Sequence, residues 1–227
     1  MVPRAMPRLG LIALGDSITV GEGNMLCGLP ARSWALWLAE ALDLPFTSRA
    51  VNGAVIGDVL RDQLPAVRAD YDVGVVYIGV NDVRGTGWDP VTYEAGLRTV
   101  AETLRDRAER LLFLTIPLDL GRPRAGAKVA GANDVIRSVA RDAGAAVAEL
   151  ADLEGWTLVL PDAVHPTALG QLEIADRAAR ALGAPRTPSE LAGGFTLGPR
   201  GRASYARTHL RLLARDVLRR RIEAARA

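Results

Sequence analysis

The chain has 227 residues, of which 49% are hydrophobic and 24% are charged, so it holds enough apolar material for the core of one α/β domain. A formal net charge of +2 argues against nucleic acid as the main partner, and the single cysteine, Cys27, excludes an internal disulfide and favours a reducing, cytoplasmic location. No apolar run approaches the roughly 20 residues that span a bilayer, and we interpret residues 1–8 as mature sequence and not as a signal peptide.

Short apolar runs alternate with helical patterns along most of the chain. Strands are predicted at residues 9–14, 46–51, 73–80, 111–116 and 146–150. Helices are predicted to begin near Ser33, Gly57, Pro90, Ala127 and Pro166. This alternation predicts a three-layer α/β/α, flavodoxin-like fold with a five-stranded parallel sheet in the order 2-1-3-4-5.

The C-terminal part of the chain has a different composition. We expect a domain over residues 1–183, a Pro/Gly-rich linker over 184–202 and a basic amphipathic helix over 203–227. That helix has two interpretations. Its apolar stripe packs on its own domain or on a second subunit, or the helix lies on an anionic membrane surface or an acidic partner.

Ser17 follows the first predicted strand directly. The carboxyl ends of strands are where open α/β sheets place their ligands. Serines after strands are also common as turn formers and helix N-caps, so Ser17 alone does not identify a nucleophile.

A second candidate lies near the end of the sheet domain, in Asp162-Ala163-Val164-His165-Pro166. His165 is one of two histidines, and the other, His209, lies in the basic helix, so His165 is the natural candidate for a base at neutral pH. Asp162 is near enough in sequence to accept the imidazole N–H, as the acid of a Ser-His-Asp triad does. The alternative is a capped turn with a surface histidine.

Acyl transfer also requires donors for an oxyanion. The candidates are the backbone N–H groups of Ser17 and Gly57 and the side-chain amide of Asn81, which follows the third predicted strand. Gly57 and Asn81 are also ordinary loop residues. Asp16 and Asp82 are expected to hold loops by hydrogen bonds.

Four segments, in order, resemble the conserved blocks of the SGNH hydrolases, also called GDSL-type esterases and lipases. They are Gly15-Asp16-Ser17, residues 52–57, Gly79-Val80-Asn81-Asp82 and Asp162-x-x-His165-Pro166. The resemblance covers residues 9–182 and implies the flavodoxin-like fold. It assigns the four residues that name the family to Ser17, Gly57, Asn81 and His165, with Gly53 as the competitor of Gly57.

The resemblance implies a serine esterase that hydrolyses carboxylic esters, such as small acyl esters, lipids or acetylated sugars. The alternatives are an acyltransferase that uses the same acyl-enzyme with a sugar or other alcohol acceptor, and a non-catalytic ligand-binding module. The substrate pocket is predicted to include Met25, Leu26, Trp88 and Leu118.

Other site types lack their signatures. The sequence has no G-x-S-x-G nucleophile elbow, and the segment Gly21-Glu22-Gly23 lacks the third glycine of a dinucleotide fingerprint. No cluster has metal-ligand spacing, so we expect no metal and no cofactor.

Overall fold

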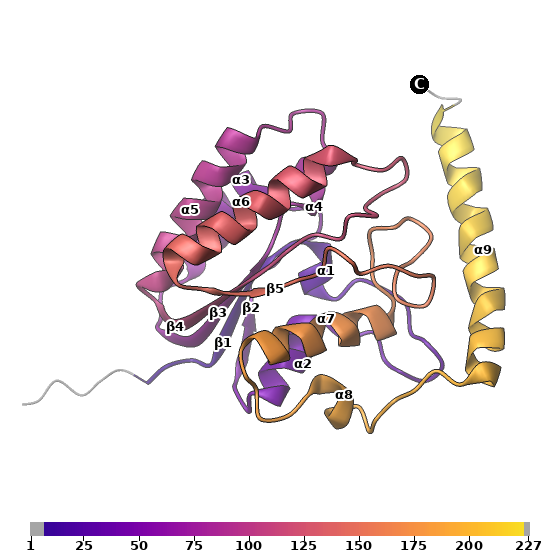
Figure 1. Ribbon diagram of the computed structural model, residues 1–227, viewed down its shortest axis with the longest axis horizontal. Coiled ribbons are helices and arrows are strands. Elements are labelled where there is room, and N and C mark those ends of the chain that lie inside the picture. Colours follow the sequence, from indigo (N-terminus) through magenta and orange to yellow (C-terminus); the bar gives the residue numbers. More distant parts are fainter. Residues whose placement is uncertain (1–6, 225–227) are drawn as a thin grey trace, which may run out of the picture.

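The structure is a computed structural model that describes residues 7–224, with side-chain surroundings up to residue 222. Five parallel strands form one sheet in the order β2-β1-β3-β4-β5 (Figure 1), which confirms the predicted topology. The strands are β1 (Leu11–Gly15), β2 (Phe46–Ser48), β3 (Tyr71–Tyr77), β4 (Ala108–Leu114) and β5 (Ala146–Ala148). Their ends differ from the predicted ones by up to three residues.

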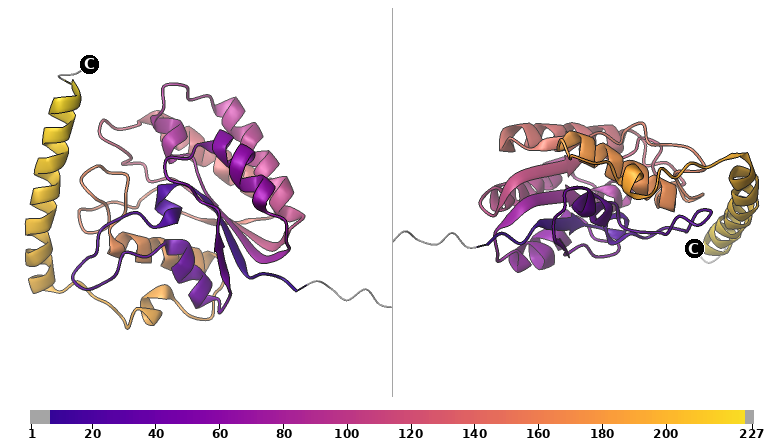
Figure 2. Two further views of the ribbon diagram at one scale, coloured as in Figure 1. Left: turned by 180° about the vertical axis from the view of Figure 1, so that it is seen from behind. Right: turned by 90° about the horizontal axis from the view of Figure 1, so that it is seen from below.

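Helices cover both faces of this sheet, as the predicted three-layer fold requires. Helices α2 (Trp34–Ala41) and α7 (Ala168–Ala181) pack together on one face, and α5 (Pro90–Arg105) and α6 (Ala127–Ala143) pack together on the other (Figure 2). Ser33 caps α2, as predicted from its sequence, and α7 begins two residues after the predicted Pro166 because the Thr167 hydroxyl caps it.

The core lies between these layers. β1 is fully buried and pairs with β3 in a register that places Gly15 opposite Tyr77. Both strands therefore end at the same edge of the sheet, and the segments that follow them are neighbours.

Three short helices follow strand ends at this edge. They are α1 (Ser17–Val20), α3 (Ile56–Asp58) and α4 (Val80–Arg84). The helix that was predicted to begin near Gly57 is not one continuous α-helix, because α3 changes to a π-helix, η1 (Val59–Gln63), and then to a 3-10 helix, η2 (Leu64–Ala66). Pro65 has no N–H to continue the α-helical hydrogen bonds.

The predicted linker at 184–202 contains a short helix, α8 (Pro188–Leu191), and the beginning of α9 (Pro199–Ala224). A capping box of Thr187 and Glu190 forms α8, and the backbone N–H of Ser189 donates to Asp176 Oδ1 at 2.9 Å, so α8 is fixed to α7.

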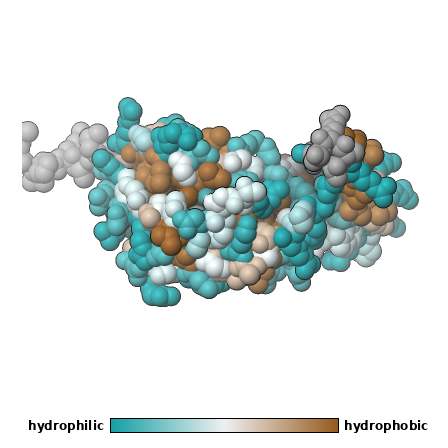
Figure 3. All heavy atoms as spheres, turned by 90° about the horizontal axis from the view of Figure 1, so that it is seen from above, coloured by the Kyte–Doolittle hydropathy of each residue, from teal (hydrophilic) through white to brown (hydrophobic). Residues whose placement is uncertain are grey.

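Helix α9 runs along one side of the molecule (Figure 1). Tyr205, which is buried, stacks on Trp156 with ring centroids 5.7 Å apart, and His209 meets the same indole edge-on. The first half of α9 therefore packs on its own domain. Other apolar side chains of α9 remain exposed among hydrophilic ones (Figure 3), namely Leu210, Leu213, Val217, Leu218 and Ile222. Among the described helices, none combines the length and apolar character needed to cross a bilayer.

Candidate active site

The turn that carries Ser17 is built by the two residues before it. Gly15 ends β1, and a Cβ at this position would lie 2.5 Å from the backbone oxygen of Tyr77, so the close approach of the two strand ends requires glycine. Asp16 is the N-cap of α1, and its Oδ1 accepts a hydrogen bond from the Ile18 amide at 3.0 Å. Ser17 is thus the first residue of a short helix at the carboxyl edge of the sheet.

Two buried glutamines hold this turn, and neither was predicted from the sequence. Gln63 accepts from the Gly15 N–H at 2.9 Å and donates to the Gly15 carbonyl at 2.8 Å. Gln171 donates from Nε2 to the carbonyl oxygens of Ile18 and Glu22, at 3.0 and 3.2 Å. The sequence signal that could have identified them is a polar residue among the apolar positions of a helix. Such a residue is rarely buried unless its side chain is hydrogen-bonded.

The structure brings Ser17, His165 and Asp162 together. The Ser17 Oγ lies 3.1 Å from His165 Nε2, and His165 Nδ1 lies 2.7 Å from Asp162 Oδ2. Asp162 Oδ1 accepts from the backbone amides of Val164 and His165, at 2.9 and 3.1 Å. With Asp162 as acceptor, the proton of a neutral imidazole belongs on Nδ1, which leaves Nε2 free to accept the proton of Ser17.

The charges at this site favour a protonated imidazole. The hydrogen bond to Asp162 raises the pKa of His165, burial opposes this, and the charges of Asp162, Glu22 and Asp16 add to the increase. Burial raises the pKa of Asp162, but the hydrogen bonds from His165 and Val164 together with the charge of His165 outweigh burial, and the pKa is lowered overall. An ionised acid beside a basic imidazole suits general-base chemistry.

Glu22 also reaches the imidazole. Its Oε2 lies 3.3 Å from His165 Nε2, on the nitrogen that faces Ser17. From the sequence, Glu22 was noted only within the segment Gly21-Glu22-Gly23. Its available signal was a charged side chain between two glycines, five residues after Ser17.

The predicted oxyanion donors lie at the same edge of the sheet. Gly79, with φ of +117°, is the N-cap of α4, and Asn81 is the second residue of that helix. Asn81 Nδ2 donates to the Ala54 carbonyl at 3.0 Å, which fixes the amide and leaves its other N–H available. Gly57 is the second residue of α3, so its N–H belongs to the first turn, where amides have no intrahelical partner.

Asp16 and Asp82 hold loops by hydrogen bonds, as predicted. Asp82 Oδ1 accepts from the Ile56 amide at 2.9 Å and so connects α4 to α3. Asp16 is fully buried, and burial raises its pKa to about 7. Burial likewise raises the pKa of Asp82.

The family model of the GDSL-like lipase/acylhydrolase family matches residues 13–172. The chain belongs to this family. It is therefore a carboxylic ester hydrolase of the GDSL type, and the predicted family is confirmed. No curated protein matches the sequence.

Solved structures resemble this GDSL hydrolase over most of its length. LAE5, described as an alpha/beta hydrolase enzyme from the metagenome of Lake Arreo, Spain, is 20% identical, with a TM-score of 0.65 over 78% of this chain and 96% of its own. Axe2, an acetylxylan esterase from Geobacillus stearothermophilus, is 18% identical, with a TM-score of 0.60 over 78% and 97%. TesA is 21% identical, with a TM-score of 0.63 over 76% and 97%. At these identities the likeness supports the fold.

A hollow of about 250 Å³ adjoins Asn81 in the GDSL hydrolase. Trp88, one of the predicted pocket residues, lines it together with Val55, Ile56 and Tyr93. Trp88 packs against Tyr93 with ring centroids 5.2 Å apart, so one wall of the hollow is aromatic.

The other predicted pocket residues lie elsewhere. Leu26 is fully buried, because residues 26–29 form a tight turn in which Leu26 and Leu29 exchange backbone hydrogen bonds and Leu26 points into the core. The prediction that Leu26 lines the substrate pocket is therefore wrong, because a fully buried core side chain cannot contact a ligand. Met25 and Leu118 are exposed by 65% and 51%, and neither lines the hollow beside Asn81.

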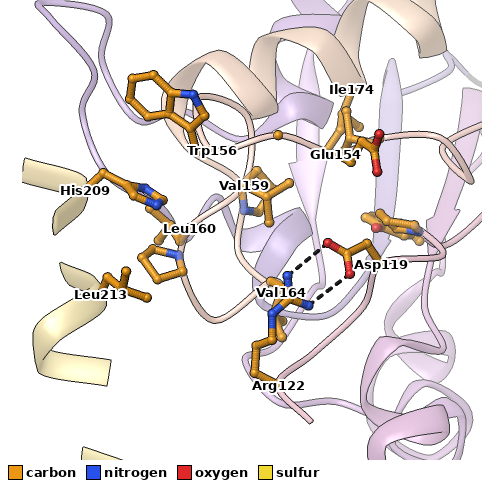
Figure 4. A pocket seen from close by; sticks show the side chains of 17 residues that line it. Asp119, Arg122, Glu154, Trp156, Val159, Leu160, Val164, Ile174, His209 and Leu213 are labelled. Carbon is orange, nitrogen blue, oxygen red and sulfur yellow. Dashed lines mark hydrogen bonds and ion pairs between the residues drawn. The ribbon is translucent and has the colours of Figure 1, made fainter. Parts of the chain in front are cut away.

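A second cavity of about 250 Å³ lies between α9 and the segment 153–166 (Figure 4). Trp156, Leu160, Val164 and His209 line it, and the Asp119–Arg122 ion pair closes one side. Ser17 and His165 are not among its lining residues. Over the described part of the chain, no group of three or more His, Cys, Asp or Glu side chains is arranged to hold a metal ion.

Proposed function

We propose that this GDSL hydrolase cleaves esters of short carboxylic acids by two-step acyl transfer through Ser17, His165 and Asp162. The observation that carries the proposal is the continuous relay of 3.1 Å from Ser17 Oγ to His165 Nε2 and 2.7 Å from His165 Nδ1 to Asp162. Nucleophile, base and orienting acid are within reach of one another without rearrangement.

In the first step, His165 Nε2 takes the proton of Ser17 as Oγ attacks the ester carbonyl. The tetrahedral oxyanion is held by the N–H groups of Ser17 and Gly57 and by Asn81 Nδ2. His165 then protonates the leaving alcohol as the acyl C–O bond breaks. In the second step, His165 activates water, which releases the acid from Ser17.

The hollow beside Asn81 supports a short acyl group. In this proposal the carbonyl oxygen points toward Asn81 and the acyl substituent lies in the adjoining hollow of about 250 Å³, which Ile56 and Trp88 line and Ser17 and His165 do not. That volume is below the usual range for drug-sized ligands. The likeness to an acetylxylan esterase makes acetylated sugars the first esters to test.

The test compares wild type, Ser17→Ala and Ser204→Ala on p-nitrophenyl esters from acetate to palmitate. Ser204 is an exposed serine of α9 and serves as the matched control. We expect kcat to fall by about 10⁴-fold or more for Ser17→Ala and to stay unchanged for Ser204→Ala, with acetate or butyrate preferred. Equal rates for Ser17→Ala and wild type would contradict the proposal. Transfer of the acyl group to an added sugar in preference to water would identify an acyltransferase instead.

A further inference from the structure

Glu22 is fixed beside the reacting groups by its backbone. Its N–H donates to the carbonyl of Ser17 at 3.0 Å, and its own carbonyl accepts from Gln171 Nε2 at 3.2 Å. Gln171 is fully buried, so the position of Glu22 is tied both to the core and to the turn that carries the nucleophile.

One carboxylate oxygen of Glu22 is fixed by a hydrogen bond, and the other faces the imidazole of His165. Oε1 accepts a hydrogen bond from Asn52 Nδ2, and Oε2 lies 3.3 Å from His165 Nε2. The side chain is 43% exposed, so the carboxylate stands on the solvent side of the imidazole. It therefore meets solvent beside the imidazole and does not lie in the packed interior.

In the mechanism proposed above, His165 Nε2 gives its proton to the leaving alcohol. The alcohol oxygen must then lie within hydrogen-bond distance of Nε2. Because Glu22 Oε2 lies 3.3 Å from the same nitrogen, the carbon next to the leaving oxygen comes close to this carboxylate. A hydroxyl on the following carbon can then donate to Glu22 Oε2, whereas a plain alkyl chain offers this oxygen no hydrogen bond.

Resting on the proposed function, we propose that Glu22 is a specificity-determining residue on the leaving-group side, and that its carboxylate accepts a hydrogen bond from a hydroxyl vicinal to the ester oxygen. The preferred substrates are then short-chain esters of neutral polyhydroxylated alcohols, of the sugar or glycerol type. Esters of anionic alcohols are disfavoured, because the leaving group meets a charge of the same sign. The reaction is unchanged: the acyl C–O bond breaks, the proton taken from Ser17 passes to the alcohol oxygen, and the acyl group stays on Ser17.

The test measures kcat/KM for 1-monoacetylglycerol and for propyl acetate, which differ in leaving group only by the two hydroxyls. Both esters form the same acetyl-enzyme, so a difference in kcat/KM arises in the acylation step, where the alcohol leaves. Monoacetylated xylose provides the sugar arm. The proteins are wild type, Glu22→Ala, Glu22→Gln and Glu102→Ala, the last being a matched control at an exposed glutamate of α5.

We expect wild type to prefer monoacetylglycerol, monoacetylxylose or both over propyl acetate. In Glu22→Ala this preference should fall by about 10- to 100-fold. Glu22→Gln should lose less of it, because the neutral amide still accepts a hydrogen bond, although a weaker one than the charged carboxylate accepts. Glu102→Ala should keep the wild-type preference. Thermal unfolding of each variant shows whether it is folded.

An unchanged preference in folded Glu22→Ala, with activity that still depends on Ser17, would overturn this inference and leave the proposed function intact. Activity that persists in Ser17→Ala would overturn the proposed function itself. A Glu22-dependent preference for acetylcholine over all three esters would also overturn the inference, because the carboxylate would then recognise a cation and not a hydroxyl.

Discussion

Gln63 and Gly15 lie 48 residues apart in sequence, yet the side-chain amide of Gln63 hydrogen-bonds both the N–H and the carbonyl of Gly15. Gly15 is the last residue of β1 and precedes Asp16 and Ser17. The glutamine therefore continues the hydrogen-bonding pattern of the strand at the point where the chain leaves the sheet, and it sets the direction in which the nucleophile turn departs.

Replacing Gln63 by Met should lower the free energy of unfolding by about 2–5 kcal/mol. Methionine has a similar volume, but it leaves the buried N–H and carbonyl of Gly15 without partners. Urea denaturation measures the loss. Asp62→Ala is the control, because its ion pair with Arg61 is at the surface and contributes little. Equal stabilities of the two variants would contradict the role assigned to Gln63.

Asp162→Asn should reduce kcat by about 10³- to 10⁴-fold. Asparagine can still accept from the backbone amides of Val164 and His165, but its side-chain NH₂ cannot accept the proton on Nδ1, so the imidazole loses its orientation and tautomer. Steady-state hydrolysis of p-nitrophenyl acetate measures the change, with Ser17→Ala as the floor. A loss of tenfold or less would show that Asp162 is not the orienting acid.

Asn81→Ala should reduce kcat by about 10²- to 10³-fold, with a smaller change in KM. In the proposed mechanism this amide donates to charge that develops only in the transition state. The variant also loses the hydrogen bond to Ala54, so thermal unfolding is measured in parallel. A change confined to KM would mean that Asn81 binds substrate without stabilising an oxyanion.

The acid limb of the pH profile should have its midpoint above 6.5, the ordinary value for histidine. His165 works as a base only when neutral, and its pKa is raised by the hydrogen bond to Asp162 and by the charges of Glu22 and Asp16. Activity is therefore lost as pH falls through this raised pKa. Removing a nearby negative charge should move the midpoint to lower pH.

Asp16→Asn tests this sign in the upper part of the acid limb, because asparagine keeps the N-cap hydrogen bond to Ile18 while the charge that Asp16 carries above its pKa of about 7 disappears. The measurement is kcat/KM from pH 5 to pH 9 for wild type, Asp16→Asn and Asp106→Asn, an exposed control at the end of α5. A midpoint that moves upward in Asp16→Asn would be opposite to the expected effect.

The fold could be predicted because the local hydrophobic patterns agree with the tertiary contacts that the strands make. Residues 11–14 and 73–77 are apolar runs too short for helices, and both became central strands. Ser17 and Asn81 follow those strands within four residues, so the parallel topology alone was enough to predict that they lie near each other.

The parts that could not be predicted depend on contacts between distant residues. Leu26 was equally suited to line a pocket or to enter the core, and only the turn that it forms with Leu29 decided for the core. The approach of Glu22 to His165 joins a loop after β1 to a loop before α7, and no local pattern specifies that distance. The role of Gln63 could not be predicted for the same reason, because its partner Gly15 lies in β1, on the other side of β2 in the sequence.

The aromatic stack between Trp156 and Tyr205 links α9 to the loop that also carries Asp162. The terminal helix thus braces the acid of the proposed triad from outside the sheet domain. Removing the residues from 199 onward, or fusing a bulky tag close to the start of α9, would disturb this contact. The rate constants of such a variant would then reflect a loosened Asp162 loop and not the intact enzyme.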